Sequence, residues 1–109
     1  MTPANSLAQI RQLAASEDRC IIYTPVLDEL RARQMDTDDL LEIIASEIGE
    51  AHCFKVEPTA KYYAGTTSDY YSIWIDVCGC HMFLKLLVAS QGGIDKLVIT
   101  SFKRDDRHV

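Results

Sequence analysis

The spacing of hydrophobic residues changes near residue 50 from a helical repeat to a strand-like alternation. In the first half, Leu7, Ile10 and Leu13 recur at intervals that line one face of a helix. In the second half, residues 71–77 alternate between hydrophobic and polar, as in a half-buried strand. Helices followed by consecutive strands predict an α+β fold, with N-terminal helices packed on a C-terminal antiparallel sheet.

Capping residues divide the first half into helices. The first predicted helix carries Leu7, Ile10, Leu13 and Ala14 behind a cap at Asn5 or Ser6 and is broken at residues 17–19. The second runs from Thr24 to near Met35, and the third from Asp36 or Thr37 to a stop at Gly49. Pro25 suits the first turn of a helix, and Asp36 is a favoured capping residue. The apolar run 20–23 is either a brief strand or an extended connector.

Proline and glycine residues separate the predicted strands in the second half of the chain. The predicted strands cover residues 51–57, 71–77, 81–89 and 96–103. A polar loop is expected over 61–69, with turns at 78–80 and 90–95 and a polar tail from residue 104. We therefore expect a single domain over 1–109, with a helical half to about residue 50 and a sheet over about 51–103.

Length and composition exclude several classes of protein. The chain has 109 residues, 48% of them hydrophobic and 25% charged, which is ordinary for one globular domain. No apolar run approaches the roughly 20 residues of a membrane span, so no membrane association is expected. The chain carries no Gly-rich phosphate loop, which disfavours a Rossmann-type enzyme.

The net charge of −5 is unevenly spread along the chain. Residues 1–50 carry ten acidic and four basic side chains, whereas residues 51–109 carry six acidic and seven basic ones. A polyanion such as RNA would therefore have to bind the second half, where the attraction is weak. The acidic first half is otherwise explained as a solvated helical surface.

The cysteines raise the question of a metal site. They are Cys20, Cys53, Cys78 and Cys80. Residues 1–15 lack the basic start and apolar stretch of a signal peptide, so we expect a cytoplasmic protein with reduced thiols. Cys78, Cys80 and His81, with His52 and Cys53, give an alternative zinc hypothesis, but their spacing is not that of two Cys-x-x-Cys pairs. We expect neither a metal nor another cofactor.

Several fragments resemble one family. Residues 72–77, 83–85 and 98–103 resemble the MqsR family of toxin ribonucleases from bacterial toxin–antitoxin systems. Residues 7–13 are similar to the opening helix of that family, and 35–48 fall where its aspartate-rich helical stretch lies. The resemblance implies a RelE-like fold, metal-free endonucleolytic cleavage of messenger RNA, and a cognate antitoxin protein that silences the toxin.

The resemblance also implies site residues. The lysine that follows an aromatic residue in the family matches Lys55, and the lysine of its closing Ser-Phe-Lys matches Lys103. Two family positions differ, since Ile75 stands in place of a glutamine and Phe83 in place of a tyrosine. The alternative is therefore a weakened or inactive member of the fold that binds an antitoxin, a toxin or another bacterial or phage protein. A metal-dependent enzyme that uses the cysteines is a third hypothesis.

Metal-free RNA cleavage requires cations to stabilise the phosphorane, a base and an acid. Lysines supply the cations, and a lysine of depressed pKa can also act as the base. The candidate catalytic residues are Lys55, Lys103, Lys85 and His81, and the candidate substrate-binding residues are Arg104, Tyr70 and Tyr71. We expect Trp74 in the core rather than as a base-stacking platform. The hypothesis requires Lys55 and Lys103 to converge in space.

Overall fold

The computed structural model describes residues 1–108 and contains helices and strands in the predicted order. The helices are α1 (Leu7–Ala14), α2 (Thr24–Ala32) and α3 (Thr37–Ser46). The strands are β1 (Cys20–Ile22), β2 (Cys53–Pro58), β3 (Thr67–Ile75), β4 (Cys80–Gln91) and β5 (Ile94–Arg104). Short 3-10 turns lie at Glu17–Arg19, Glu50–His52 and Asp106–His108. The α+β prediction is confirmed.

The helices α1 and α3 begin at predicted caps, whereas α2 and α3 end earlier than predicted. The Ser6 side chain accepts a hydrogen bond from the Gln9 amide at the start of α1. Asp36 and Asp39 form a reciprocal capping box at the start of α3, which satisfies two backbone donors. The helix α2 ends at Ala32 rather than near Met35, and α3 ends at Ser46, before Gly49.

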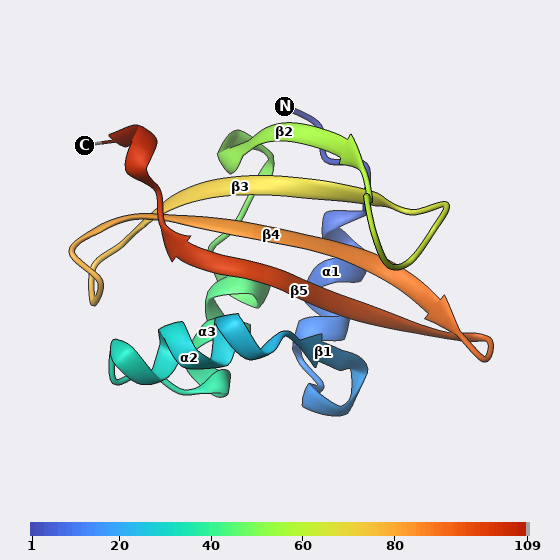
Figure 1. Ribbon diagram of the computed structural model, residues 1–109, viewed down its shortest axis with the longest axis horizontal. Helices are drawn as coiled ribbons and strands as arrows, with labels where there is room; N and C mark the ends of the chain where they lie inside the picture. The colour runs from blue at the N-terminus through green and yellow to red at the C-terminus, as the bar shows by residue number, and fades with distance from the viewer. Residues whose placement is uncertain (109) are drawn as a thin grey trace.

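The strands form one sheet in the order β1-β5-β4-β3-β2 (Figure 1). Strands β2 to β5 are antiparallel neighbours, as predicted. The run 20–23 supplies the strand β1, which pairs in parallel with β5 through Cys20 and Leu97, so the sheet is mixed. This pair is parallel because a long crossover, rather than a hairpin, connects β1 and β5.

The sheet buries one face under helices and leaves the other without a helix. Buried residues of α1, α2 and α3 pack with β3, β4 and β5 in the main core, and α1 and α3 lie on one side of the sheet (Figure 1). On the opposite side, a small cluster of Leu87, Ala89 and Val98 packs with Tyr63 and Tyr23. No helix within residues 1–108 contributes to that cluster, and we call this side the open face.

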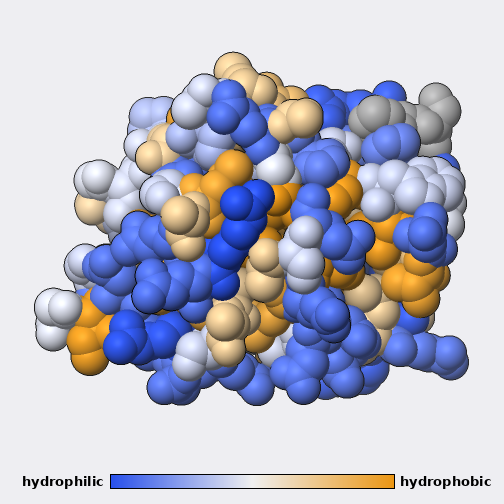
Figure 2. Space-filling view, turned by 180° about the vertical axis from the view of Figure 1, so that it is seen from behind, coloured by the Kyte–Doolittle hydropathy of each residue, from blue (hydrophilic) through white to orange (hydrophobic). Residues whose placement is uncertain are grey.

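The reverse of the view in Figure 1 is mostly hydrophilic, with hydrophobic residues in separate patches (Figure 2). The helices described within residues 1–108 are all too short or too polar to cross a lipid bilayer.

A buried carboxylate joins the N-terminal segment to the sheet. Asp69 is 0% exposed and accepts hydrogen bonds from the backbone amides of Ala4 and Asn5 and from the Asn5 side chain, at 2.8 to 2.9 Å. The Asn5 side chain also donates to the Thr67 carbonyl and accepts from the Val88 amide. These bonds explain why β3 begins at Thr67, inside the region predicted to be a loop, since residues 67–69 are fixed against the chain start.

We expect Asn5→Ala to lower the free energy of unfolding by on the order of 2 kcal/mol, because two strands lose their side-chain partner. Urea denaturation measures this difference. The matched control is Gln12→Ala on the exposed side of α1, which should change stability little. An unchanged midpoint for Asn5→Ala would contradict a structural role for this link.

Candidate functional site

Three charged and aromatic side chains lie in one row across the open face. Tyr70 of β3 pairs with Lys55 of β2 on one side and with Lys85 of β4 on the other. Both ammonium groups lie over the Tyr70 ring, with Lys55 Nζ at 5.2 Å and Lys85 Nζ at 5.1 Å from its centroid. Each contact is within the range of a cation–π interaction. The cross-strand register therefore brings two cations to one aromatic ring.

An aromatic cluster extends this row. The ring centroids of Phe54, Tyr70 and Phe83 lie 5.5 to 6.2 Å from one another at steep angles, the usual geometry of packed aromatic side chains. Lys103 Nζ lies 5.4 Å from the Phe83 centroid, and Arg107 Cζ lies 3.4 Å from the Phe54 centroid. Four cations, those of Lys55, Lys85, Lys103 and Arg107, thus lie around the same three rings.

These side chains form a hollow of about 280 Å³, which we call the cationic hollow. It is lined by Phe54, Lys55, Tyr70, Phe83, Lys103, Arg104, Asp105, Asp106 and Arg107. Lys55 and Lys103, separated by 47 intervening residues, therefore share one concave surface. Four basic and two acidic side chains line it, which gives a local balance of +2 in a chain of net charge −5.

A buried carboxylate holds Arg107 in this position. Asp105 is 4% exposed and accepts hydrogen bonds from Arg107 Nη2 at 2.8 Å, from Arg107 Nε at 3.0 Å and from Ser72 Oγ at 2.5 Å. The bonds from Arg107 and Ser72 lower the pKa of Asp105 below its ordinary value, against the opposing effect of burial. The fork of bonds fixes the guanidinium plane above Phe54.

The contribution of Asp105 to stability should depend on pH. Because its folded-state pKa is lowered, the stabilisation is complete above the unfolded-state pKa of about 3.9 and is lost as the pH falls below it. We expect Asp105→Asn to cost about 1–3 kcal/mol at pH 7, and the difference from wild type to shrink between about pH 5 and pH 2. Urea denaturation across this pH range measures the effect. Asp28→Asn, at an exposed site, is the control, and a pH-independent difference would contradict the assignment.

Glu57 affects the charge states of both Lys55 and Tyr70. Lys55 Nζ forms an ion pair with Glu57 Oε1 at 2.9 Å, and this carboxylate raises the pKa of Lys55. The bonds from Lys55 and Tyr70 in turn lower the pKa of Glu57. Burial, and then the hydrogen bond to Glu57 at 2.8 Å, raise the pKa of the Tyr70 phenol. Lys55 is therefore a cation at neutral pH, and a role as the base of depressed pKa does not fit it.

The other two predicted catalytic residues, Lys85 and His81, do not line the cationic hollow. Lys85 contacts Tyr70 but does not line the cationic hollow. His81 pairs with Trp74, two positions along the β3–β4 ladder from the pair of Ser72 and Phe83, and its ring packs edge-on against Trp74 at 5.5 Å. The structure thus brings Lys55 and Lys103 together and leaves His81 beyond the hollow.

Trp74 lies on the open face, so the expectation of a core tryptophan was wrong. Its side chain is 50% exposed, and its Nε1 donates to Asp76 Oδ1 at 2.8 Å. The alternation of β3 gives the reason, because Ile73 and Ile75 take the buried positions on the helical side.

The same alternation separates the two adjacent tyrosines. Tyr70 lines the cationic hollow, and Arg104 lies on its rim, as residues that could contact a substrate. Tyr71 points to the helical side, is 0% exposed, and its hydroxyl has no hydrogen-bond partner among residues 1–108. A substrate-binding role for Tyr71 therefore does not fit this fold.

We expect Tyr71→Phe to raise the free energy of unfolding by about 1 kcal/mol, because it removes a buried polar group without breaking a hydrogen bond. Thermal and urea denaturation measure the change. A loss of stability would instead show that the hydroxyl has a hydrogen-bond partner such as a bound water.

Sequence reasoning missed Phe54, Glu57, Asp105 and Arg107. Arg107 lies in the segment predicted to be a polar tail, and no periodic pattern marks it. The only signal for Glu57 was its position two residues after Lys55, which places both on one face of a strand.

The cysteines do not assemble a metal site within residues 1–108. All four are free thiols, and no group of three His, Cys, Asp or Glu side chains in this part of the chain is arranged to hold a metal ion. Cys78 and Cys80 instead contact the sulfurs of Met35 and Met82 at 3.7 and 3.6 Å. Burial raises the pKa of Cys78, which keeps that thiol protonated.

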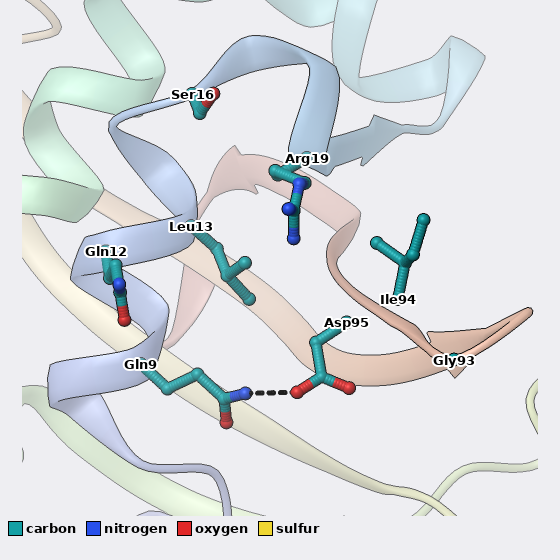
Figure 3. Close-up of a pocket in the computed structure, with 8 residues that line it drawn as sticks. All are labelled: Gln9, Gln12, Leu13, Ser16, Arg19, Gly93, Ile94 and Asp95. Carbon is teal, nitrogen blue, oxygen red and sulfur yellow. Dashed lines mark hydrogen bonds between the residues drawn. The ribbon is translucent and has the colours of Figure 1, made fainter.

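A larger cavity of about 480 Å³ lies between α1 and the β4–β5 turn (Figure 3). Gln9 Nε2 donates to Asp95 Oδ2 across it at 2.7 Å. Its lining shares no residue with the cationic hollow. This hydrogen bond ties the first helix to the hairpin, a structural link.

No known family model matches the chain, and no curated protein matches it in sequence.

Proposed function

We propose that this chain is a toxin-type endoribonuclease that cleaves messenger RNA without a metal ion and is neutralised by a cognate antitoxin protein. The proposal depends on one observation: Lys55, Lys103 and Arg107 converge on one hollow with an aromatic floor. Cytoplasmic messenger RNA is the substrate that the resemblance to MqsR toxins implies. The antitoxin partner rests on that resemblance alone.

The cationic hollow suits a phosphate flanked by unpaired bases. Lysine and arginine side chains on one concave surface neutralise a phosphodiester, and exposed aromatic rings beside them stack on bases. Double-stranded nucleic acid does not present its bases for such stacking, so a single strand is the better ligand. The rings of Phe54, Tyr70 and Phe83 are half-buried, which leaves part of each available.

The side chains around the hollow can be given roles in cleavage. In this reaction the ribose 2′-hydroxyl attacks the adjacent phosphorus, and the bond from phosphorus to the 5′-oxygen breaks. Glu57 would take the proton of the 2′-hydroxyl, and Tyr70 would give its phenolic proton to the leaving oxygen. Proton transfer from Glu57 to Tyr70 along their hydrogen bond would restore both groups. Lys55 and Lys103 would stabilise the charge on phosphorus, with Lys85 assisting.

A second candidate is RNA binding without cleavage, and the charge states favour it. The lowered pKa of Glu57 makes that carboxylate a weak base. Phe83, which has no hydroxyl, stands in place of the tyrosine of the MqsR family. Both candidates share the same surface, so they differ only in whether bound RNA is cut.

Fragment analysis of single-stranded RNA, with and without a chelator, tests the proposal together with binding measurements. We expect wild-type protein to cut RNA in the presence of chelator. The double variant Lys55→Ala, Lys103→Ala should bind RNA at least tenfold more weakly. Glu57→Gln should keep most of the binding and lose about 10²–10⁴ in cleavage rate, the usual effect of removing a general base.

Arg31→Ala is the control for loss of positive charge outside the hollow, because Arg31 lies on the exposed side of α2. It should bind and cleave as wild type does. Wild-type protein that binds but never cuts RNA would favour the second candidate. A double lysine variant with unchanged binding would refute both.

A further inference from the structure

We propose that a second hollow on the open face, beside the cationic hollow, binds the base of the neighbouring nucleotide and distinguishes one base from another. The inference rests on the proposed function, because it names which part of the same RNA strand lies there. The inference depends on one observation: the cationic hollow and a second hollow rich in hydroxyl and aromatic side chains lie on either side of Lys85.

The second hollow has a volume of about 310 Å³, at the lower end of small-ligand sites. Hydroxyl-bearing side chains dominate its lining: Tyr23, Thr59, Tyr62, Ser68, Thr100 and Ser101. Hydroxyls both donate and accept hydrogen bonds, so they can match the mixed edge of a base. A lining of this kind suits a planar polar group better than a purely apolar one.

Lys85 joins the two hollows. It lines the second hollow, pairs with Ser101 of β5 on one side and with Tyr70 of β3 on the other, and its ammonium lies over the Tyr70 ring. Tyr70 lines the cationic hollow. Side chains two residues apart on one strand face are separated by roughly 7 Å, so Phe83 and Lys85 mark adjacent positions along the sheet. One strand of RNA can therefore contact both hollows.

The loop before β3 is held so that Tyr62 stands at the second hollow. Tyr63 has a φ of 61°, a left-handed conformation that is costly for a bulky side chain. Its carbonyl accepts bonds from the Thr66 amide and hydroxyl, and its ring packs into the open-face cluster. The adjacent Tyr62 is left 68% exposed while it lines the hollow. The exposed ring of Tyr62 therefore offers a surface on which a base can stack.

Further hydroxyl contacts define the rim. The Thr59 hydroxyl bonds to those of Thr66 at 2.8 Å and Ser68 at 2.9 Å, which closes the loop at the edge of the hollow. Burial and the neighbouring hydroxyls of Tyr63 and Tyr62 raise the pKa of Tyr23. The Ser101 side chain is half-buried and lines the second hollow, where its hydroxyl can face a ligand.

Binding of short homopolymers of A, C, G or U tests the inference, with 2′-O-methyl riboses so that cleavage cannot occur. We expect wild-type protein to rank the four probes by affinity and Ser101→Ala to compress that ranking. Tyr62→Ala should weaken binding by about tenfold, the cost of one lost stacking contact, whereas Tyr62→Phe should keep it. Lys103→Ala should weaken all four probes by the same factor and lower the salt dependence by about one counterion.

The outcomes separate the two proposals. If Lys103→Ala weakens binding while Ser101→Ala and Tyr62→Ala change neither affinity nor ranking, the second hollow is not a base site and the proposed function stands. Equal affinity of wild-type protein for all four probes also overturns base discrimination. If wild-type protein binds no probe, the proposed function fails, and this inference fails with it. Arg31→Ala again controls for loss of charge.

Discussion

A β-bulge at Thr100 decides which face of the sheet Lys103 occupies. Leu86 pairs with Ile99 and Lys85 pairs with Ser101, so β5 holds one residue more than β4 at this point. Before the bulge Ile99 faces the buried core, and after it Phe102 does, which turns Lys103 to the open face. Without the extra residue, strict alternation would place Lys103 on the side of Ile99, under the helices.

A second bulge acts in the same way on β2. Cys53 pairs with Tyr71 and Lys55 pairs with Tyr70, which leaves Phe54 as the extra residue. Cys53 is buried in the core, whereas Phe54 and Lys55 both contact the Tyr70 ring on the open face. The cationic hollow therefore depends on two local departures from regular pairing, each of which re-aims side chains.

The sequence predicted the local features of the fold correctly and missed those that depend on pairing between strands. Caps and periodicity are local, so Ser6 and Asp36 predicted the helix starts correctly. The resemblance to a known family selected Lys55 and Lys103, but their convergence depends on register shifts between strands, which no local pattern encodes. The sequence alone did not show which of the adjacent Tyr70 and Tyr71 faces the core, whereas the strand register places them on opposite faces of the sheet. Arg107 was missed because its position is fixed by a tertiary contact with Asp105, which no sequence repeat reveals.

Two cations of the cationic hollow, Lys55 and Arg107, are paired with carboxylates of the same chain. Glu57 binds Lys55 at an exposed position, so a phosphate must compete with this carboxylate for the ammonium. An exposed ion pair of this kind is weak and is screened by salt, so the competition costs the ligand little. The pair of Arg107 with the buried Asp105 is different, because its two parallel bonds fix the guanidinium plane. The ammonium of Lys55 can therefore exchange partners while the guanidinium of Arg107 stays bound to Asp105. If RNA binds here as proposed, the position of Arg107 is set before the strand arrives.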